Sequence, residues 1–192
     1  MDITKYKISD TEYLKINPEC IHDHECKTCA QIDIDYVDEK NNIYIKFGHT
    51  TVSSFCYFLT KYDAITQLLK GTRILDKAIT HDLGFEWNQF YKGEQKSNEA
   101  FKYHLRSNDH KEIRPYYNIW IYNDEEGNII FEITPFYPWF YETKKTCPEK
   151  IPYKLWIKDY KPIVKTIIPK ENLKQWIKQA DEFGKKYKVK FE

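Results

Sequence analysis

Two pairs of segments have the apolar patterns of β-strands, and in the first pair apolar and polar residues alternate strictly, with the period of two that is typical of half-buried strands. The first pair spans residues 32–47, and its connection at 38–42 is rich in acidic and asparagine residues. The second pair spans residues 117–133, and its connection at 123–128 contains Gly127, which can adopt a positive φ angle. Each pair therefore predicts a β-hairpin.

The spacing of apolar residues changes to steps of three and four after the first hairpin. This spacing predicts an amphipathic helix from about Thr51 to Lys70, ended by Gly71, and a short second helix over 74–79, ended by Gly84. A third helix is predicted after Pro169, which suits a first helical turn. Its expected buried stripe is Leu173, Trp176, Ile177, Ala180 and Phe183.

The remaining segments give weaker patterns. Residues 84–98 show no period, and residues 101–106 alternate like a strand, with a helix as the alternative. Two prolines in 134–142 exclude a central strand and predict an extended segment at a sheet edge or in a loop. Two further strands are predicted at 153–157 and 163–168.

These elements together predict the fold class. A chain of 192 residues fits one domain, residues 1–192, and its 17% aromatic content favours a well-packed core. We expect an α+β fold with an antiparallel, mostly meander sheet and helices packed on one face. Trp120 on the second hairpin and Trp176 on the last helix are the expected core anchors.

Charge and composition exclude some classes of function. The net charge is +1 and the only arginines are Arg73, Arg106 and Arg114, which disfavours nucleic-acid binding. No apolar run approaches the ~20 residues that span a bilayer, so no membrane association is expected. The first residues lack the pattern of a signal peptide, and the cysteine count of 5 is odd, so a reducing cytoplasm is the expected compartment.

Residues 20–29 concentrate cysteine and histidine, the ligands that Zn²⁺ prefers. Cys26 and Cys29 have the C-x-x-C spacing that lets two sulfurs reach one ion from a tight turn. The candidate metal ligands are Cys20, His22, His24, Cys26 and Cys29. No distant second pair exists, so a polar loop with reduced thiols and a redox role for the C-x-x-C pair stay open as alternatives.

No common catalytic motif occurs in the sequence. His49, the pair His81 and Asp82, and Cys147 could each belong to a catalytic site, but helix capping and packing explain the histidines better, and Cys147 would need a histidine that the fold brings near it. Cys56 lies on the apolar face of the first predicted helix and is expected to be a small buried hydrophobe. Whether the chain is an enzyme stays open at this stage.

An aromatic run after the second hairpin is the best candidate for a contact surface, because Trp and Tyr dominate binding hot spots. The candidate partner-binding residues are Phe136, Tyr137, Trp139, Phe140 and Tyr141. The alternative is that these rings cover one end of the sheet. A near-neutral, aromatic-rich chain without catalytic motifs favours a non-catalytic bacterial intracellular binding or inhibitor protein, such as an immunity or antitoxin protein, whose partner is another protein. The alternative function is a zinc-dependent enzyme or a zinc-stabilised regulatory protein that uses the Cys20–Cys29 cluster.

Overall fold

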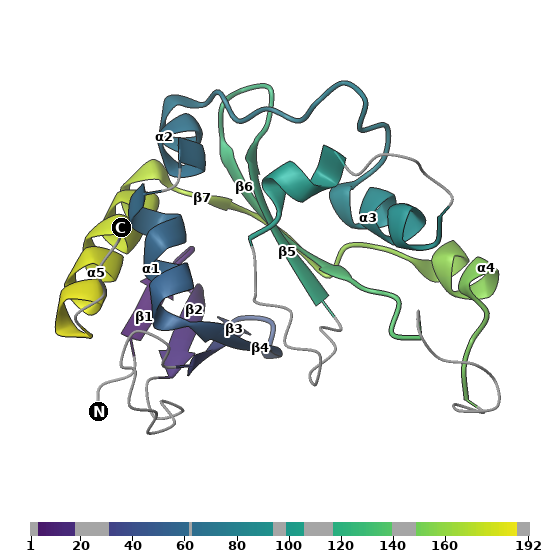
Figure 1. Ribbon diagram of the computed structural model, residues 1–192, viewed down its shortest axis with the longest axis horizontal. Coiled ribbons are helices and arrows are strands. Elements are labelled where there is room, and N and C mark those ends of the chain that lie inside the picture. Colours follow the sequence, from purple (N-terminus) through teal and green to yellow (C-terminus); the bar gives the residue numbers. More distant parts are fainter. Residues whose placement is uncertain are drawn as a thin grey trace.

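The strands form two antiparallel meander sheets in the part of the chain that the structure, a computed structural model, describes (Figure 1). The described residues are 4–17, 31–61, 63–93, 99–105, 117–139 and 149–187. Sheet A contains β1 (Thr4–Lys7), β2 (Glu12–Asn17), β3 (Gln31–Asp38) and β4 (Ile43–Thr51), and sheet B contains β5 (Tyr117–Asn123), β6 (Ile129–Pro135) and β7 (Val164–Ile168). The predicted α+β class with antiparallel meander strands is confirmed.

Helices connect and cover these sheets. They are α1 (Val52–Lys61), α2 (Asp63–Lys70), α3 (Leu83–Tyr91), α4 (Tyr153–Trp156) and α5 (Lys170–Lys186), with 3₁₀ helices η3 (Glu99–Tyr103) and η4 (Ile157–Asp159). The helix predicted after Pro169 is confirmed as α5. The helix predicted from Thr51 to Lys70 is present as two helices, α1 and α2.

Both predicted hairpins are confirmed. Asp38 pairs with Ile43 at the end of the β3–β4 ladder, and Asn123 pairs with Ile129 at the end of the β5–β6 ladder. Gly127 has a φ angle of 78° in the second connection, as its position predicts. Strand β7 confirms most of the strand predicted at 163–168.

Several other predictions were wrong. The predicted helix at 74–79 is absent, because Ile74 instead forms an isolated bridge to Asn123. Gly84 does not end a helix but lies inside α3, which is capped at its start by the Asp82 side chain. The strand predicted at 153–157 is helical, since α4 and η4 occupy it.

Helix α5 covers the free edge of sheet A. The side chains of Asn172, Trp176 and Gln179 donate hydrogen bonds to the carbonyl oxygens of Ile8, Lys7 and Lys5, at distances of 3.0, 2.7 and 3.1 Å. The three donors follow one face of the helix, and two of the three acceptors belong to the edge strand β1. The covered edge is thereby removed as a site for pairing with another chain.

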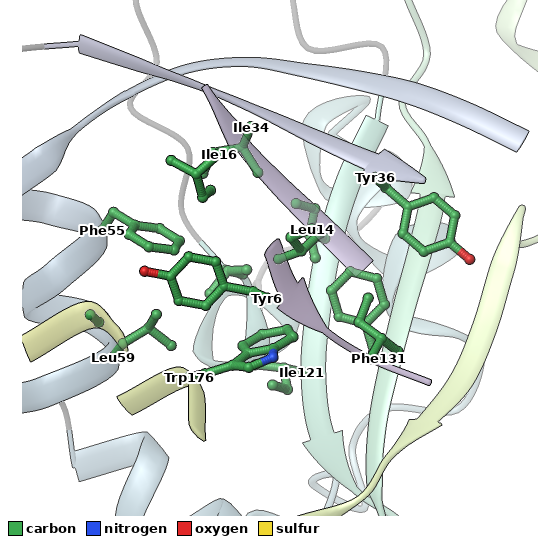
Figure 2. Packing of buried hydrophobic residues seen from close by; sticks show 14 of the residues in the cluster. Tyr6, Leu14, Ile16, Ile34, Tyr36, Phe55, Leu59, Ile121, Phe131 and Trp176 are labelled. Atoms are coloured by element: carbon green, nitrogen blue, oxygen red, sulfur yellow. The ribbon is translucent and has the colours of Figure 1, made fainter. Parts of the chain in front are cut away.

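One apolar core joins sheet A, helices α1 and α5, and one face of sheet B (Figure 2). The Tyr6 ring lies at its centre, 5.1 Å from the Phe55 ring and 5.9 Å from the Trp176 ring. Tyr36 of sheet A stacks on Phe131 of sheet B with their ring centroids 6.0 Å apart. Trp176 is 1% exposed, as predicted.

The opposite face of sheet B packs against α3 and η3. The second apolar cluster consists of Leu83, Trp87, Ala100, Tyr103, Trp120, Tyr122 and Ile130. Trp120 has no exposed surface, as predicted. Strands β5 and β6 are therefore buried on both faces. No helix in the described part of the chain is both long and apolar enough to cross a membrane.

Candidate functional site

Asn88 of α3 holds the start of the aromatic run at residues 136–141 in place. Its side chain accepts a hydrogen bond from the Tyr137 backbone N–H at 2.8 Å and donates to the Pro135 carbonyl oxygen at 3.1 Å. It also donates to the Gly84 carbonyl oxygen within its own helix. Asn88 has no exposed surface. Its side chain supplies the hydrogen bonds that a neighbouring strand would otherwise give to this proline-containing segment.

The residues of the aromatic run, which were predicted to contact a partner, have different environments. Tyr137 has no exposed surface and donates from its hydroxyl to the Ile151 carbonyl oxygen at 2.6 Å, so its ring lies in the protein interior. Phe136 and Trp139 are half-buried. Phe140 and Tyr141 lie outside the described residues, and their predicted contact role stays a prediction.

Phe136 forms a group with three other rings, Tyr91, Trp87 and Phe101, that the sequence had not indicated as contact residues. The Phe136 ring lies 5.5 Å from Tyr91, which lies 5.1 Å from Trp87. Phe101 stacks on the same Trp87 ring at 6.0 Å, with 8° between the two planes. Phe101 is 45% exposed and Tyr91 is 38% exposed. We call Tyr91, Phe101 and Phe136 the aromatic surface.

A polar cluster lies beside these rings, where the start of α3 meets sheet B. We define it as Asp82, Tyr122, Glu132, Thr134, Tyr160 and Lys165. Tyr122, Glu132 and Thr134 are buried, Asp82 and Tyr160 are half-buried, and Lys165 is exposed. Asp82 accepts hydrogen bonds from the Phe85 backbone N–H at 2.9 Å and from the Tyr160 hydroxyl at 2.6 Å. Thr134 accepts a hydrogen bond from Trp120 Nε1 at 2.7 Å.

Gly84 permits this close approach of α3 to the sheet. A Cβ atom at this position would overlap the Thr134 Oγ1 and Tyr160 Oη atoms. Any larger residue at position 84 therefore moves α3 away from the two hydroxyl groups.

Glu132 is the most deeply buried acid of the cluster and has no exposed surface. Its Oε2 atom accepts a hydrogen bond from the Tyr122 hydroxyl at 2.8 Å and lies 3.7 Å from Lys165 Nζ. Its Oε1 atom has no hydrogen-bond partner among the described residues. Burial raises the pKa of the Glu132 carboxyl, although Tyr122 and Lys165 oppose that shift.

The two tyrosines of the cluster are hydrogen-bond donors. Burial, followed by the nearby Glu132 carboxylate, raises the pKa of Tyr122. Burial, followed by the nearby Asp82 carboxylate, raises the pKa of Tyr160. Both phenols therefore keep their protons at neutral pH and donate them to carboxylates.

His81 and Asp82, which could have formed a catalytic pair, have separate partners. The Nδ1 atom of His81 lies 3.3 Å from Glu86 Oε1, while Asp82 caps α3. The same Glu86 oxygen accepts from the backbone N–H groups of Thr80 and His81, both at 3.2 Å. These contacts fix the loop that leads into α3.

The remaining candidate residues are only partly described. Cys56 is fully buried as expected, and burial raises the pKa of its thiol to about 12, which keeps it protonated. The side chain of His49 and residue Cys147 lie outside the described part, as do Cys20, His22, His24, Cys26 and Cys29. Within the described residues, no three His, Cys, Asp or Glu side chains are grouped to hold a metal ion.

Sequence reasoning missed the polar cluster because Glu132 and Thr134 alternate with apolar residues, which is the usual pattern of a solvent-facing strand position. The one available signal was the pair of large aromatic residues on that same face of β5, Trp120 and Tyr122. Comparison with known proteins adds no assignment: no family model, curated protein or solved structure matches this chain.

Proposed function

We propose that the protein is a non-catalytic binding or inhibitor protein that contacts another protein through its aromatic surface. The observation that carries the proposal is the exposure of Phe101 and Tyr91 on a single group of packed rings. Isolated exposed apolar residues are ordinary on protein surfaces. Here, in contrast, the exposed rings form one group, although they come from the separate segments α3, η3 and the residues after β6.

The backing of this surface supports a binding role. Trp87 is 6% exposed and contacts both Tyr91 and Phe101, so the exposed rings rest on a fixed ring. Rings that are already ordered lose little conformational entropy on binding. Aromatic residues with these properties are typical of interface hot spots.

The concrete form of the proposal is a bacterial cytoplasmic inhibitor of the immunity or antitoxin type. The acidic turns that follow β3 and β5 would add negative charge to the protein surface for such a contact, because Glu39, Glu125 and Glu126 are exposed. Exposed charges of this kind raise association rates and select partners more than they add affinity.

Affinity capture from cells of the source organism, followed by titration with the captured protein, tests this proposal. Phe101→Ala should weaken binding by at least ~2 kcal/mol, about 30-fold, if Phe101 is a hot spot. Tyr57→Ala is the matched control, since Tyr57 is 48% exposed but lies on α1. Equal affinities of the two variants would contradict the assignment of the contact to the aromatic surface.

A zinc-dependent or zinc-stabilised function is a second proposal, favoured by the C-x-x-C spacing of Cys26 and Cys29. About one equivalent of Zn²⁺ should then co-purify, and the Cys26→Ser, Cys29→Ser double variant should lose it. Metal-free protein whose thiols all react under native conditions would exclude this function.

A further inference from the structure

Four aromatic rings, none of which belongs to the aromatic surface, form a box beside Asn88. Tyr137 and Trp139 follow β6, and Tyr153 and Trp156 belong to α4. The Tyr137 ring centroid lies 5.3 Å from Tyr153, 5.4 Å from Trp156 and 5.6 Å from Trp139, with interplanar angles of 81°, 61° and 69°. The Tyr153 and Trp156 rings stack on each other, with their centroids 6.1 Å apart and 29° between their planes, so they form one side of the box, and Tyr137 and Trp139 form the others.

An ammonium group of the protein itself faces this box. Lys92 Nζ lies 5.7 Å from the ring centroid of Tyr137 and 5.7 Å from that of Tyr153. Both distances fall within the ~6 Å range of cation–π attraction. Lys92 is an exposed residue that directly follows α3, where its backbone N–H donates to the Asn88 carbonyl oxygen at 3.1 Å.

The box is rigid on its inner side and open to solvent at its rim. The Tyr137 backbone N–H and hydroxyl are both hydrogen-bonded, to Asn88 and to the Ile151 carbonyl oxygen, which fixes its ring. Tyr153 is 5% exposed. Trp139 and Trp156 are only half-buried and therefore border the solvent.

We propose that this aromatic box is a binding site for an alkylammonium group and that Lys92 is its internal occupant. Several aromatic rings arranged around one cation are the usual means of recognising quaternary ammonium and methylated lysine, because the ring faces carry negative charge density. The inner rings are already held in place, so little ordering is needed on binding. Lys92 has a flexible side chain and can leave the box without unfolding of α3.

The proposal goes beyond the proposed function, since none of the four box rings belongs to the aromatic surface. It predicts that Lys92 competes with an added alkylammonium ion for the box. Removal of the Lys92 ammonium should therefore increase the affinity for an added alkylammonium ion.

The test is titration of tetramethylammonium chloride into the whole protein, followed by tryptophan fluorescence, with sodium chloride at equal ionic strength as the reference. Lys92→Ala should bind at least about tenfold more tightly than the wild type. Lys154→Ala, which removes an exposed lysine of α4, should bind like the wild type. The Trp156→Ala change in the Lys92→Ala protein should abolish saturable binding.

Two further probes complete the design. tert-Butanol has nearly the shape of tetramethylammonium without its charge and should not bind, and equal binding of the two would overturn the cation assignment. N-acetyl-trimethyllysine methylamide tests a lysine side chain as the source of the group, and tighter binding than tetramethylammonium would identify that source. No saturable binding of either cation by folded Lys92→Ala, or by Lys92→Gln as a second variant, overturns the proposal.

Discussion

The two faces of sheet B are built from different chemistry although both are buried. On the face toward sheet A, strands β5 and β6 contribute Ile119, Ile121, Ile129, Phe131 and Ile133, all in one apolar core. The face toward α3 combines Trp120, Tyr122 and Ile130 with the polar residues Asn118, Glu132 and Thr134. The same two strands therefore meet an apolar layer on one side and a hydrogen-bonded layer on the other.

The difference shows what each layer must supply. Against β5 and β6, sheet A fills space, and its Tyr36 ring does so by stacking on Phe131. Its polar contact with sheet B lies at β7, where the Thr166 hydroxyl donates to Glu12 Oε2 at 3.0 Å. Helix α3 must also satisfy polar groups, and it meets them with the Asp82 and Asn88 side chains. Buried polar groups cost free energy unless they are paired, so the α3 layer tolerates less change in orientation than the apolar layer.

The largest expected effect is the loss of a whole buried ring. Trp120→Ala and Phe131→Ala should each lower the free energy of unfolding by ~3–5 kcal/mol, because both side chains have no exposed surface. Trp120→Phe tests the polar contribution of the α3 face by itself, because it keeps a ring but removes the hydrogen bond to Thr134 Oγ1. Chemical denaturation measures all three. A loss under about 1 kcal/mol for Trp120→Ala would show that the α3 layer does not pack as described.

The next effect tests how closely α3 approaches the sheet. Gly84→Ala should cost ~1–3 kcal/mol or more, since its methyl group would overlap Thr134 Oγ1 and Tyr160 Oη. The cost should be smaller when Tyr160→Phe removes one of the two hydroxyl groups, and a double-mutant cycle of denaturation midpoints measures this coupling. Strict additivity of the two changes would mean that α3 and Tyr160 are not in contact.

A pH-dependent effect should distinguish the polar face from the apolar face. The folded-state pKa of Glu132 is raised above 4.5, the ordinary value, so the folded protein keeps this proton to a higher pH than the unfolded chain does. The neutral carboxyl therefore contributes its full stability at pH values below the pKa of Glu132 in the unfolded chain. This contribution is lost as the pH rises through the higher pKa of Glu132 in the folded protein. Tyr122 and Lys165 reduce the shift, and Asp82 increases it.

The variant Glu132→Gln measures this loss, since an amide cannot ionise but still accepts the Tyr122 hydrogen bond. The stability of the wild type relative to this variant should fall as pH rises above about 4.5 and then level off. Denaturation curves of both proteins at several pH values give the difference. A difference that stays constant with pH, or that rises with it, would show that the Glu132 carboxyl is not destabilised by burial.

The sequence predicted those parts of the fold in which one period dominates. The first hairpin and α5 have clear periods, and the second hairpin has two runs rich in Ile and aromatic residues around a defined turn; all three are confirmed. Segment 153–157 has the apolar content of a strand but forms α4 and η4, whose Tyr153 and Trp156 rings pack on Tyr137. That contact depends on residues far away in the sequence, so local periodicity could not predict it.

The candidate sites were less predictable than the fold for the same reason. The aromatic run was a local signal, but the structure divides it between an interior ring, Tyr137, and a surface ring, Phe136, according to what α3 contributes. The box around Lys92 needs α3, the segment after β6 and α4 at once. No spacing within a single segment carries this information.

The smallest expected effect on stability concerns the aromatic surface. Phe101 is 45% exposed and stacks on Trp87 at the outer side of the α3 layer. Phe101→Ala should therefore change the free energy of unfolding by no more than about 0.5 kcal/mol, the usual range for surface substitutions. Denaturation of this variant beside Trp120→Ala compares a surface ring with a buried ring of the same layer. A loss above about 2 kcal/mol would place Phe101 in the core, and the aromatic surface would then lose its most exposed member and its main support as a contact site.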